Sequence, residues 1–339
     1  MIVGSDQQWS IERLFRRYLI EEGAAVELFG AQNLFYDYYN ASLLNKIVFR
    51  SGVSSIYKKI DAQLELKMVE FKPDLVWIFK GMEILPATIR KMKQEGRKVI
   101  NYNPDNPFIF TGKGSGNANV TRSIGLYDLH LTYSREIEQQ LIRDYDARTA
   151  LLPFGYDIPD ELYNDCRRQT EVVRCCFLGN PDPQRAKFIM ELAEGGLELD
   201  LYGNDWDKFV HHKHIHAHPP VYADEFYKTL QRYRVQLNMM RVHNLHSHNM
   251  RSFEIPAIGG IQLAPDTPEH RQFFRRGEEI FLYGGTRECI DTAQRLLTLS
   301  PSEASHIREK ARSRSVRDGY SYRHRAIQAL NVMKGLCHE

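Results

Sequence analysis

Short apolar runs alternate with amphipathic segments along the first half of the chain. Residues 75–79 form a fully apolar run, which is typical of a strand buried on both faces of a parallel sheet. A helical pattern then begins at Pro86 and ends at Gly96, as proline and glycine favour. Further strands are expected at 25–29, 98–102, 128–133 and 149–153, and helices at 11–19, 36–71 and 134–145.

The alternation stops at 153–164, where prolines and acidic residues gather, and then restarts. Strands are expected at 172–178, 197–202, 235–240, 261–264 and 279–283, and helices at 185–194, 224–233 and 250–258. Repeated strand–helix units predict parallel sheets with helices on both faces. We therefore expect an α/β fold of two Rossmann-like domains, residues 1–158 and 159–320, with ligands beyond the carboxyl ends of the strands in a cleft between them.

Composition limits the class of protein. The 339 residues suffice for two domains with sizeable cores, and 45 basic against 43 acidic residues predict no nucleic-acid partner. Five cysteines lack the spacing of a zinc or disulfide framework, so reduced thiols are expected: Cys166, Cys175, Cys176, Cys289 and Cys337. No signal-peptide pattern and no bilayer-spanning apolar run are present, which favours a cytoplasmic location.

Two common nucleotide-binding signatures are missing from the sequence. No G-x-G-x-x-G follows the first strand, and no P-loop occurs. Gly112, Gly114 and Gly116 form a glycine-rich tract without a strong strand before it, which favours a mobile loop. The histidine-rich residues 211–218 have spacings that can bind metal, but no neighbouring cysteine or carboxylate frames them, so a solvated loop and no metal site are expected.

The strongest local signal for binding is the segment 251–260, a short helix closed by two glycines. The N–H groups of a helix N-terminus can bind phosphate, the Arg251 guanidinium suits a diphosphate, and Glu254 can accept hydroxyl groups of a ribose. An ordinary helix with an exposed Arg and Glu explains this segment equally well. In the preceding loop, His243, His246 and His248 either face a leaving phosphate or belong to an exposed polar loop.

The second half of the chain resembles the GT-B glycosyltransferases of the CgeB-like group. The pieces that carry this resemblance are FLGN at 177–180 followed by Arg185, LYGNDW at 201–206, VQLN at 235–238, RSFEIPAIGG at 251–260 and GEEI at 277–280. They occur in the family's order. Looser matches in the first half are PDLV at 73–76, NPDNP at 103–107 and LPFGYD at 152–157.

The resemblance implies that the C-terminal domain binds a nucleotide-diphosphate sugar, UDP-, GDP- or dTDP-linked, as co-substrate without a metal. By position, Glu254 would bind the ribose, Arg251 and the 179–180 loop would lie beside the diphosphate, and Tyr202 would line the base pocket. The donor residues carried over are Gly179, Asn180, Arg185, Tyr202, Gly203, Asn204, Val221, Tyr222, Asn238, Arg251, Phe253, Glu254, Gly259 and Gly260.

The resemblance also implies that the N-terminal domain binds the acceptor, a glycan, a lipid-linked group or a protein. Asp105 and Asp6 each follow an expected strand, and either could act as a general base or be a turn or cap residue. Pro104 replaces the histidine of a His-Asp pair found in related enzymes. His246 replaces a glutamate that many retaining members carry. Retention and inversion of the sugar's anomeric configuration therefore both remain open.

The sequence therefore predicts a hexosyltransferase that moves a sugar from its nucleotide to an acceptor hydroxyl in the interdomain cleft. An epimerase-like GT-B enzyme and a non-catalytic spore or surface protein are the alternatives. Residues 321–339 are expected to cross back to the first domain. The basic residues of the last helices predict a solvated face, or else peripheral contact with an anionic membrane: Arg308, Lys310, Arg312, Arg314, Arg317, Arg323 and Arg325.

Overall fold

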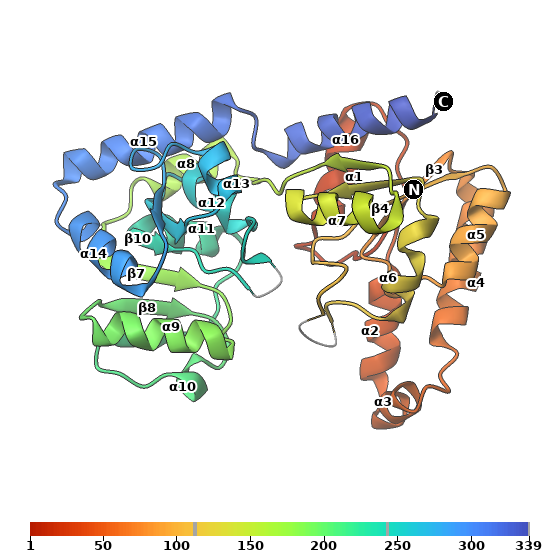
Figure 1. The fold of residues 1–339 in the computed structure, drawn as a ribbon, viewed down its shortest axis with the longest axis horizontal. Coiled ribbons are helices and arrows are strands. Elements are labelled where there is room, and N and C mark those ends of the chain that lie inside the picture. Colours follow the sequence, from red (N-terminus) through yellow and green to blue (C-terminus); the bar gives the residue numbers. More distant parts are fainter. Residues whose placement is uncertain (111–113, 242–243, 338–339) are drawn as a thin grey trace. The chain divides into compact units, whose positions relative to one another are not determined.

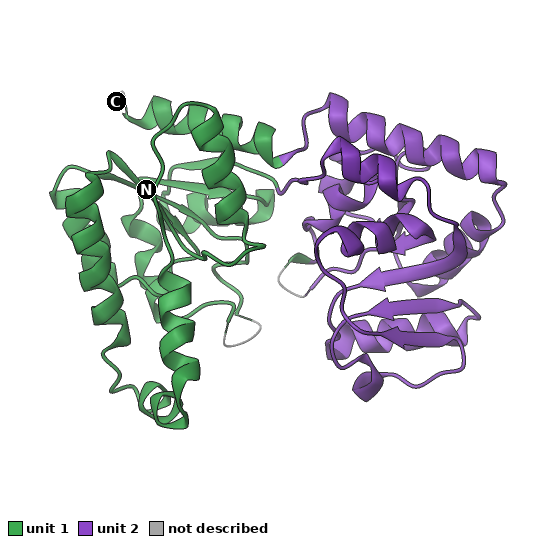
Figure 2. Cartoon of the chain, turned by 180° about the vertical axis from the view of Figure 1, so that it is seen from behind, with its two compact units in different colours: residues 1–153, 242–244, 322–339 green, residues 154–241, 245–321 purple. Residues whose placement is uncertain are grey.

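The computed structural model describes residues 1–110, 114–241 and 244–337, which divide into two α/β units (Figures 1 and 2). Unit 1 contains Met1–Pro153 and the C-terminal segment that begins at Tyr322, and unit 2 contains Phe154–Arg241 and Leu245–Ser321. Each unit has a six-stranded parallel sheet covered by helices. The predicted α/β fold with two Rossmann-like parts is thereby confirmed.

The sheet of unit 1 has the strand order β2-β1-β3-β4-β5-β6. Its strands are β1 (Ile2–Val3), β2 (Leu28–Phe29), β3 (Leu75–Phe79), β4 (Lys98–Tyr102), β5 (Leu129–Thr132) and β6 (Thr149–Leu151). Its α-helices are α1 (Ile11–Glu21), α2 (Ala31–Ala41), α3 (Leu43–Arg50), α4 (Ile56–Phe71), α5 (Pro86–Gln94), α6 (Ala118–Ser123), α7 (Arg135–Tyr145) and α16 (Tyr322–Cys337). The strand order reverses between β1 and β3, which creates a topological switch point at their carboxyl ends.

The C-terminal helix α16 packs on α1 within unit 1. The rings of Phe15 and Tyr322 meet edge to face with centroids 5.7 Å apart. At the other side of the helix, Gln328 Nε2 donates to the carbonyl oxygen of Leu151 at 2.8 Å. A buried aromatic contact and a hydrogen bond to a strand end together hold this last segment on the first sheet.

The sheet of unit 2 has the strand order β12-β11-β10-β7-β8-β9. Its strands are β7 (Val172–Leu178), β8 (Leu199–Tyr202), β9 (Ile215–His218), β10 (Tyr233–Leu237), β11 (Gln262–Pro265) and β12 (Phe281–Tyr283). Its helices are α8 (Asp160–Cys166), α9 (Pro183–Glu194), α10 (Trp206–Phe209), α11 (Ala223–Arg232), α12 (Arg251–Ala257), α13 (Pro268–Phe273), α14 (Thr286–Leu297) and α15 (Pro301–Arg317). Here the order reverses between β7 and β10.

The largest departure from the sequence prediction concerns residues 211–218. Part of this expected loop is the edge strand β9, which pairs in parallel with β8. Two carboxylates of unit 2 frame the histidines: His216 Nε2 lies 2.9 Å from Glu198, and His218 Nε2 lies 2.6 Å from Asp200. The expectation of an unframed loop was therefore wrong, because the alternation of residues 214–218 has the period of a strand.

Metal-binding groups and membrane-spanning helices were sought among the described residues only. Within them, no three or more His, Cys, Asp or Glu side chains are grouped so that they could hold a metal ion. None of the described helices has both the length and the apolar character needed to cross a membrane. Of the predicted glycine-rich tract, Gly112 lies outside the described residues.

Candidate active site

Arg185 lies at the switch point of unit 2, where β7 and β10 end. Its Nη1 donates to the carbonyl oxygen of Asn180 beyond β7 at 3.2 Å, and its Nη2 donates to that of Met239 beyond β10 at 2.8 Å. The guanidinium stacks on Phe177 at 5.3 Å, and Asp182, which caps α9, lies 3.6 Å from Nε. In open α/β sheets this crevice is where ligands bind.

Positive charge accumulates around this arginine. The pKa of Arg185 is lowered to about 10, first by burial of its guanidinium and then by repulsion from Arg241 and Arg251. Attraction to Asp182 opposes the repulsion. Arg241, in the loop after β10, and Arg251, at the start of α12, are thus near enough to Arg185 to repel its charge. An anionic ligand here would relieve their repulsion.

Arg251 and Glu254 form an ion pair on the first turn of α12. The Arg251 guanidinium also lies over the Phe226 ring at 4.1 Å, so its position is held from two sides. Its Nε is buried and makes no hydrogen bond among the described residues. Glu254 is itself buried. A ligand that offers hydroxyl and phosphate groups could therefore bind both side chains in exchange for their mutual contact.

The N-terminus of α12 does not offer the free N–H groups that the sequence predicted. The N–H of Ser252 donates to Asn249, and the N–H groups of Phe253 and Glu254 both donate to the carbonyl oxygen of Met250. The turn that precedes the helix already satisfies these donors. An anion at this edge would therefore be bound by side chains rather than by these three N–H groups.

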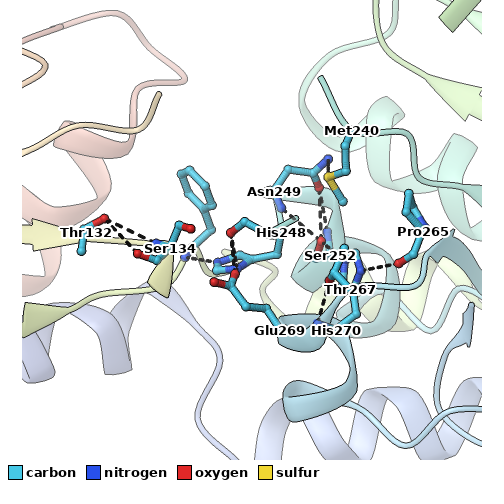
Figure 3. Close-up of polar contacts among 12 residues, drawn as sticks. Thr132, Ser134, Met240, His248, Asn249, Ser252, Pro265, Thr267, Glu269 and His270 are labelled. Atoms are coloured by element: carbon cyan, nitrogen blue, oxygen red, sulfur yellow. Dashed lines mark hydrogen bonds and ion pairs between the residues drawn. The ribbon is translucent and has the colours of Figure 1, made fainter. Parts of the chain in front are cut away.

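A buried polar network fixes the start of α12 (Figure 3). Asn249 Nδ2 donates to Asn238 Oδ1 at 2.8 Å, and Ser252 Oγ lies 2.8 Å from His270 Nε2. Burial lowers the pKa of His270 to about 4. Because His270 Nδ1 lies 2.8 Å from the carbonyl oxygen of Pro265, the neutral ring donates there and accepts from Ser252. Asn238, a predicted donor residue, thus positions the Arg251 loop from the core.

His248 belongs to the interior of unit 2. Its Nδ1 lies 2.5 Å from Glu269 Oε2, and its Nε2 accepts from the backbone N–H of Phe154 at 3.3 Å (Figure 3). Ser247 Oγ donates to the same carboxylate at 2.5 Å. Neither sequence interpretation of His248, exposed loop or phosphate ligand, fits a fully buried side chain. His246 lies in an exposed turn, and His243 lies outside the described residues.

The loops after β7 and β8 are locked together beside Arg185. A Cβ atom on Gly203 would lie 2.4 Å from the carbonyl oxygen of Gly179, so only glycine fits there. Trp206 Nε1 donates to that same oxygen at 2.8 Å, and the N–H of Asn204 donates to Asn180 Oδ1 at 3.0 Å. Gly203 and Asn204 also line a surface hollow of unit 2. These predicted residues therefore lie at the carboxyl edge.

Other predicted donor residues serve packing. Phe253 is fully buried, which removes it as a ligand contact. Gly259 has a φ of +74°, and the N–H of Gly260 donates to the carbonyl oxygen of Ile255 at 2.8 Å. This pair ends α12 and lies at the opposite end of the helix from Arg251, as expected for a C-terminal helix stop. We therefore leave these three residues out of the proposed site.

The aromatic residues expected around the base differ in exposure. The Tyr202 hydroxyl lies 2.8 Å from the Tyr233 hydroxyl, and its ring stacks on His218 at 4.5 Å. Tyr222, next to the partly exposed Val221, precedes α11 and is largely exposed. The ring of Tyr202 is thus buried structure, and Tyr222 is the one of the two with a surface open to a ligand.

Unit 1 presents charged groups at the carboxyl ends of its own strands. Lys80, which follows β3 with a φ of +61°, has its Nζ 2.6 Å from Asp105 Oδ2 beyond β4. Asp6 instead pairs with Arg13 at 2.6 Å, and both side chains are more than two-fifths exposed. Of the two predicted bases, Asp105 lies in the more enclosed position, since its side chain is 25% exposed.

Two buried carboxyl groups near Lys80 were missed by the sequence analysis. Burial raises the pKa of Glu12 to about 6 and that of Glu83 to about 7, while Lys80 opposes both shifts. The N–H of Ser5 donates to Glu12 Oε1 at 2.9 Å. Neither glutamate belongs to a sequence motif. The one feature that could have drawn attention to Glu12 is its place soon after the first strand.

Replacing Glu83 with glutamine should change how stability depends on pH. Glu83 has an ordinary pKa of 4.5 when unfolded, so the native state keeps a proton that the unfolded state loses as pH rises. The contribution of protonated Glu83 to the free energy of unfolding is fully present below pH 4.5. It is lost as pH rises to about 7. Denaturant unfolding should show this fall reduced by about 3 kcal/mol in Glu83→Gln. The exposed Glu136→Gln is the control, and identical pH profiles for wild type and Glu83→Gln would contradict the assignment.

Comparison with known proteins gives a family match in the second half of the chain. Residues 184–331 match the family described as glycosyl transferase-like, a segment that includes Arg185, Arg251 and Glu254. No curated protein sequence is significantly similar to the chain.

Solved structures with the same fold cover nearly the whole chain. Sucrose-phosphate synthase from Thermosynechococcus elongatus has a TM-score of 0.67 at 11% identity, over 99% of this chain and 98% of that one. A glycosyltransferase from Rickettsia africae has a TM-score of 0.66 at 11% identity, over 99% and 98%. An E. coli trehalose-6-phosphate structure bound with UDP-2-fluoro glucose has 0.61 at 12% identity, over 100% and 99%. Residues 184–331 therefore belong to the glycosyl transferase-like family, and the chain as a whole has the GT-B fold.

Proposed function

We propose that this chain is a glycosyltransferase whose unit 2 binds a nucleoside-diphosphate sugar as donor. The observation that carries the proposal is the position of Arg185, which joins the loops after β7 and β10 at the switch point. Arg241 and Arg251 are near enough to repel its charge. A diphosphate would add negative charge beside these guanidinium groups. The same charge increases on the diphosphate as the glycosidic bond breaks, so the arginines would stabilise the transition state more than the bound donor.

The remaining donor contacts follow from this position. Glu254 would accept hydrogen bonds from the ribose hydroxyls once Arg251 turns to the phosphates. The base would lie over the hollow lined by Gly203, Asn204 and His218, with the exposed Tyr222 beside it. The fold neighbour bound with UDP-2-fluoro glucose makes a UDP-hexose the first donor to test. His246, exposed in the turn before α12, is a candidate donor to the leaving phosphate.

We assign the acceptor to unit 1, with Asp105 as the candidate base. Its ion pair with Lys80 at the carboxyl end of β4 fixes the carboxylate in one orientation. An ionised carboxylate held in this way can take a proton from an acceptor hydroxyl. Asp6 is a weaker candidate, because its carboxylate is 43% exposed against 25% for Asp105.

Incubation with UDP-, GDP- and dTDP-hexoses, followed by mass spectrometry for released nucleotide and NMR for the configuration of the sugar, tests the proposed function. A transferase should release the nucleoside diphosphate from one donor slowly even when water is the acceptor. Conversion of the sugar without release would identify an epimerase instead, and no change with any donor would favour a non-catalytic role.

Asp105→Asn tests the base in the same assay. We expect it to reduce turnover of the preferred donor while nucleotide affinity stays unchanged, since unit 2 is not altered. Asp144→Asn, at an aspartate of unit 1 that pairs with Arg143 at 2.7 Å, is the control and should keep full turnover. Full turnover in Asp105→Asn would remove Asp105 as the base without affecting the donor assignment.

A further inference from the structure

An exposed apolar surface lies at the end of unit 1 formed by α3. Leu43, Leu44 and Ile47 on α3 and Val53 after it are between 56% and 76% exposed. We call these four residues the apolar tip. Figure 1 shows α3 at the far end of α2 and α4, away from the strands of unit 1. Scattered exposed aliphatic residues are common, but four within eleven positions of one projecting segment form a patch.

The exposure of the apolar tip is fixed by packing on the other side of α3. Phe49 meets the rings of Phe35 and Tyr57 at centroid distances of 4.9 and 5.7 Å. Ser42 caps the helix through the N–H of Asn45 at 3.0 Å, and Asn45 Nδ2 donates to the carbonyl oxygen of Tyr38 on α2 at 2.8 Å. The helix is therefore anchored by its aromatic side. Its aliphatic side does not pack against this core and stays exposed.

The segment that carries the apolar tip has charges of one sign. Residues 38–60 contain no Asp or Glu, and they contain the four basic residues Lys46, Arg50, Lys58 and Lys59. Arg50, Lys58 and Lys59 are exposed, and Lys46 Nζ lies 5.5 Å above the Tyr39 ring. On a helical wheel, positions 46 and 50 lie along one side of the face that carries 43 and 47. An apolar face beside cationic groups is complementary to a surface with anionic headgroups over hydrocarbon.

We propose that the apolar tip docks unit 1 on an anionic lipid membrane. The aliphatic side chains would enter the headgroup boundary, and the four basic residues would contact lipid phosphates. The basic residues of the last helices fit this role less well, because they are paired within their own units. These pairs are Arg308–Glu171, Arg312–Asp160, Lys310–Glu278, Arg314–Asp318 and Arg323–Glu22.

Co-sedimentation of the full chain with vesicles tests the proposal. We expect binding to equimolar phosphatidylcholine and phosphatidylglycerol and little binding to phosphatidylcholine alone. Leu43→Ser/Leu44→Ser/Ile47→Ser should lower the partition coefficient at least about tenfold. Lys58→Gln and Lys59→Gln should each lower it about fivefold, with the effect lost at high salt.

A matched control comes from the same unit. Leu66 and Val69 on α4 are 72% and 69% exposed but lie outside the apolar tip, so Leu66→Ser/Val69→Ser should bind vesicles as the wild type does. Equal loss in both sets of variants, or equal binding to neutral vesicles, would overturn the proposal. Light scattering without lipid provides a second readout. A dimer that the Leu43→Ser/Leu44→Ser/Ile47→Ser variant dissociates would assign the apolar tip to self-association instead.

Discussion

Replacement of Arg185 by methionine is expected to weaken binding of a nucleoside diphosphate by about a hundredfold. Methionine keeps an unbranched apolar stem over Phe177 but removes the guanidinium that joins the ends of β7 and β10. The loss combines a charge-assisted hydrogen bond with the loss of one of three neighbouring positive charges. Inorganic pyrophosphate should lose affinity to a similar extent, because the proposed contact is with phosphate.

Arg295→Met is the control for this variant. Arg295 also lies over a strand phenylalanine, Phe281, at 5.8 Å, but it is exposed in the last turn of α14. Calorimetry should give wild-type affinity for UDP or GDP in Arg295→Met. Equal affinities in Arg185→Met and wild type would move the diphosphate away from the switch point.

Replacement of Glu254 by alanine should separate ribose binding from phosphate binding. Loss of a carboxylate that accepts ribose hydroxyls should weaken nucleoside-diphosphate binding roughly 10- to 100-fold. Pyrophosphate should bind at least as well as before, because Arg251 is released from its ion pair with Glu254. This opposite response follows from the geometry of α12 and would not result from general unfolding.

Glu278→Ala is the matched control for Glu254→Ala. Glu278 is a half-exposed glutamate of unit 2 that pairs with Lys310 at 3.0 Å. It should leave both affinities unchanged. A parallel loss of UDP and pyrophosphate affinity in Glu254→Ala would instead assign Glu254 a structural role.

The fold was predictable where the signal is local. The expected strands at 98–102 and 172–178 coincide with β4 and β7, and Pro86 begins α5, because apolar runs and helix ends depend on neighbouring residues. Strand β9 was missed although residues 214–218 alternate with the period of a strand. Its histidines are framed by Asp200 of β8 and by Glu198 just before that strand. Pairing across a sheet is not visible in a linear pattern.

The site was predictable only in part for a similar reason. The family pattern pointed to Arg185, Arg251 and Glu254, but Arg241 comes near Arg185 only through the parallel pairing of β7 with β10. The same pattern also included Phe253 and Gly260, which the structure uses for packing. A conserved-looking segment mixes residues that bind with residues that hold the segment in place, and only burial separates them.

The most direct measurement of the central claim is a calorimetric titration of the full chain with UDP, GDP and pyrophosphate. We expect at least one nucleoside diphosphate to bind in the micromolar range, Arg185→Met to weaken both it and pyrophosphate, and Glu254→Ala to weaken the nucleotide alone. Absence of binding by any of the three ligands to the wild-type chain would contradict a donor site at the β7/β10 switch point.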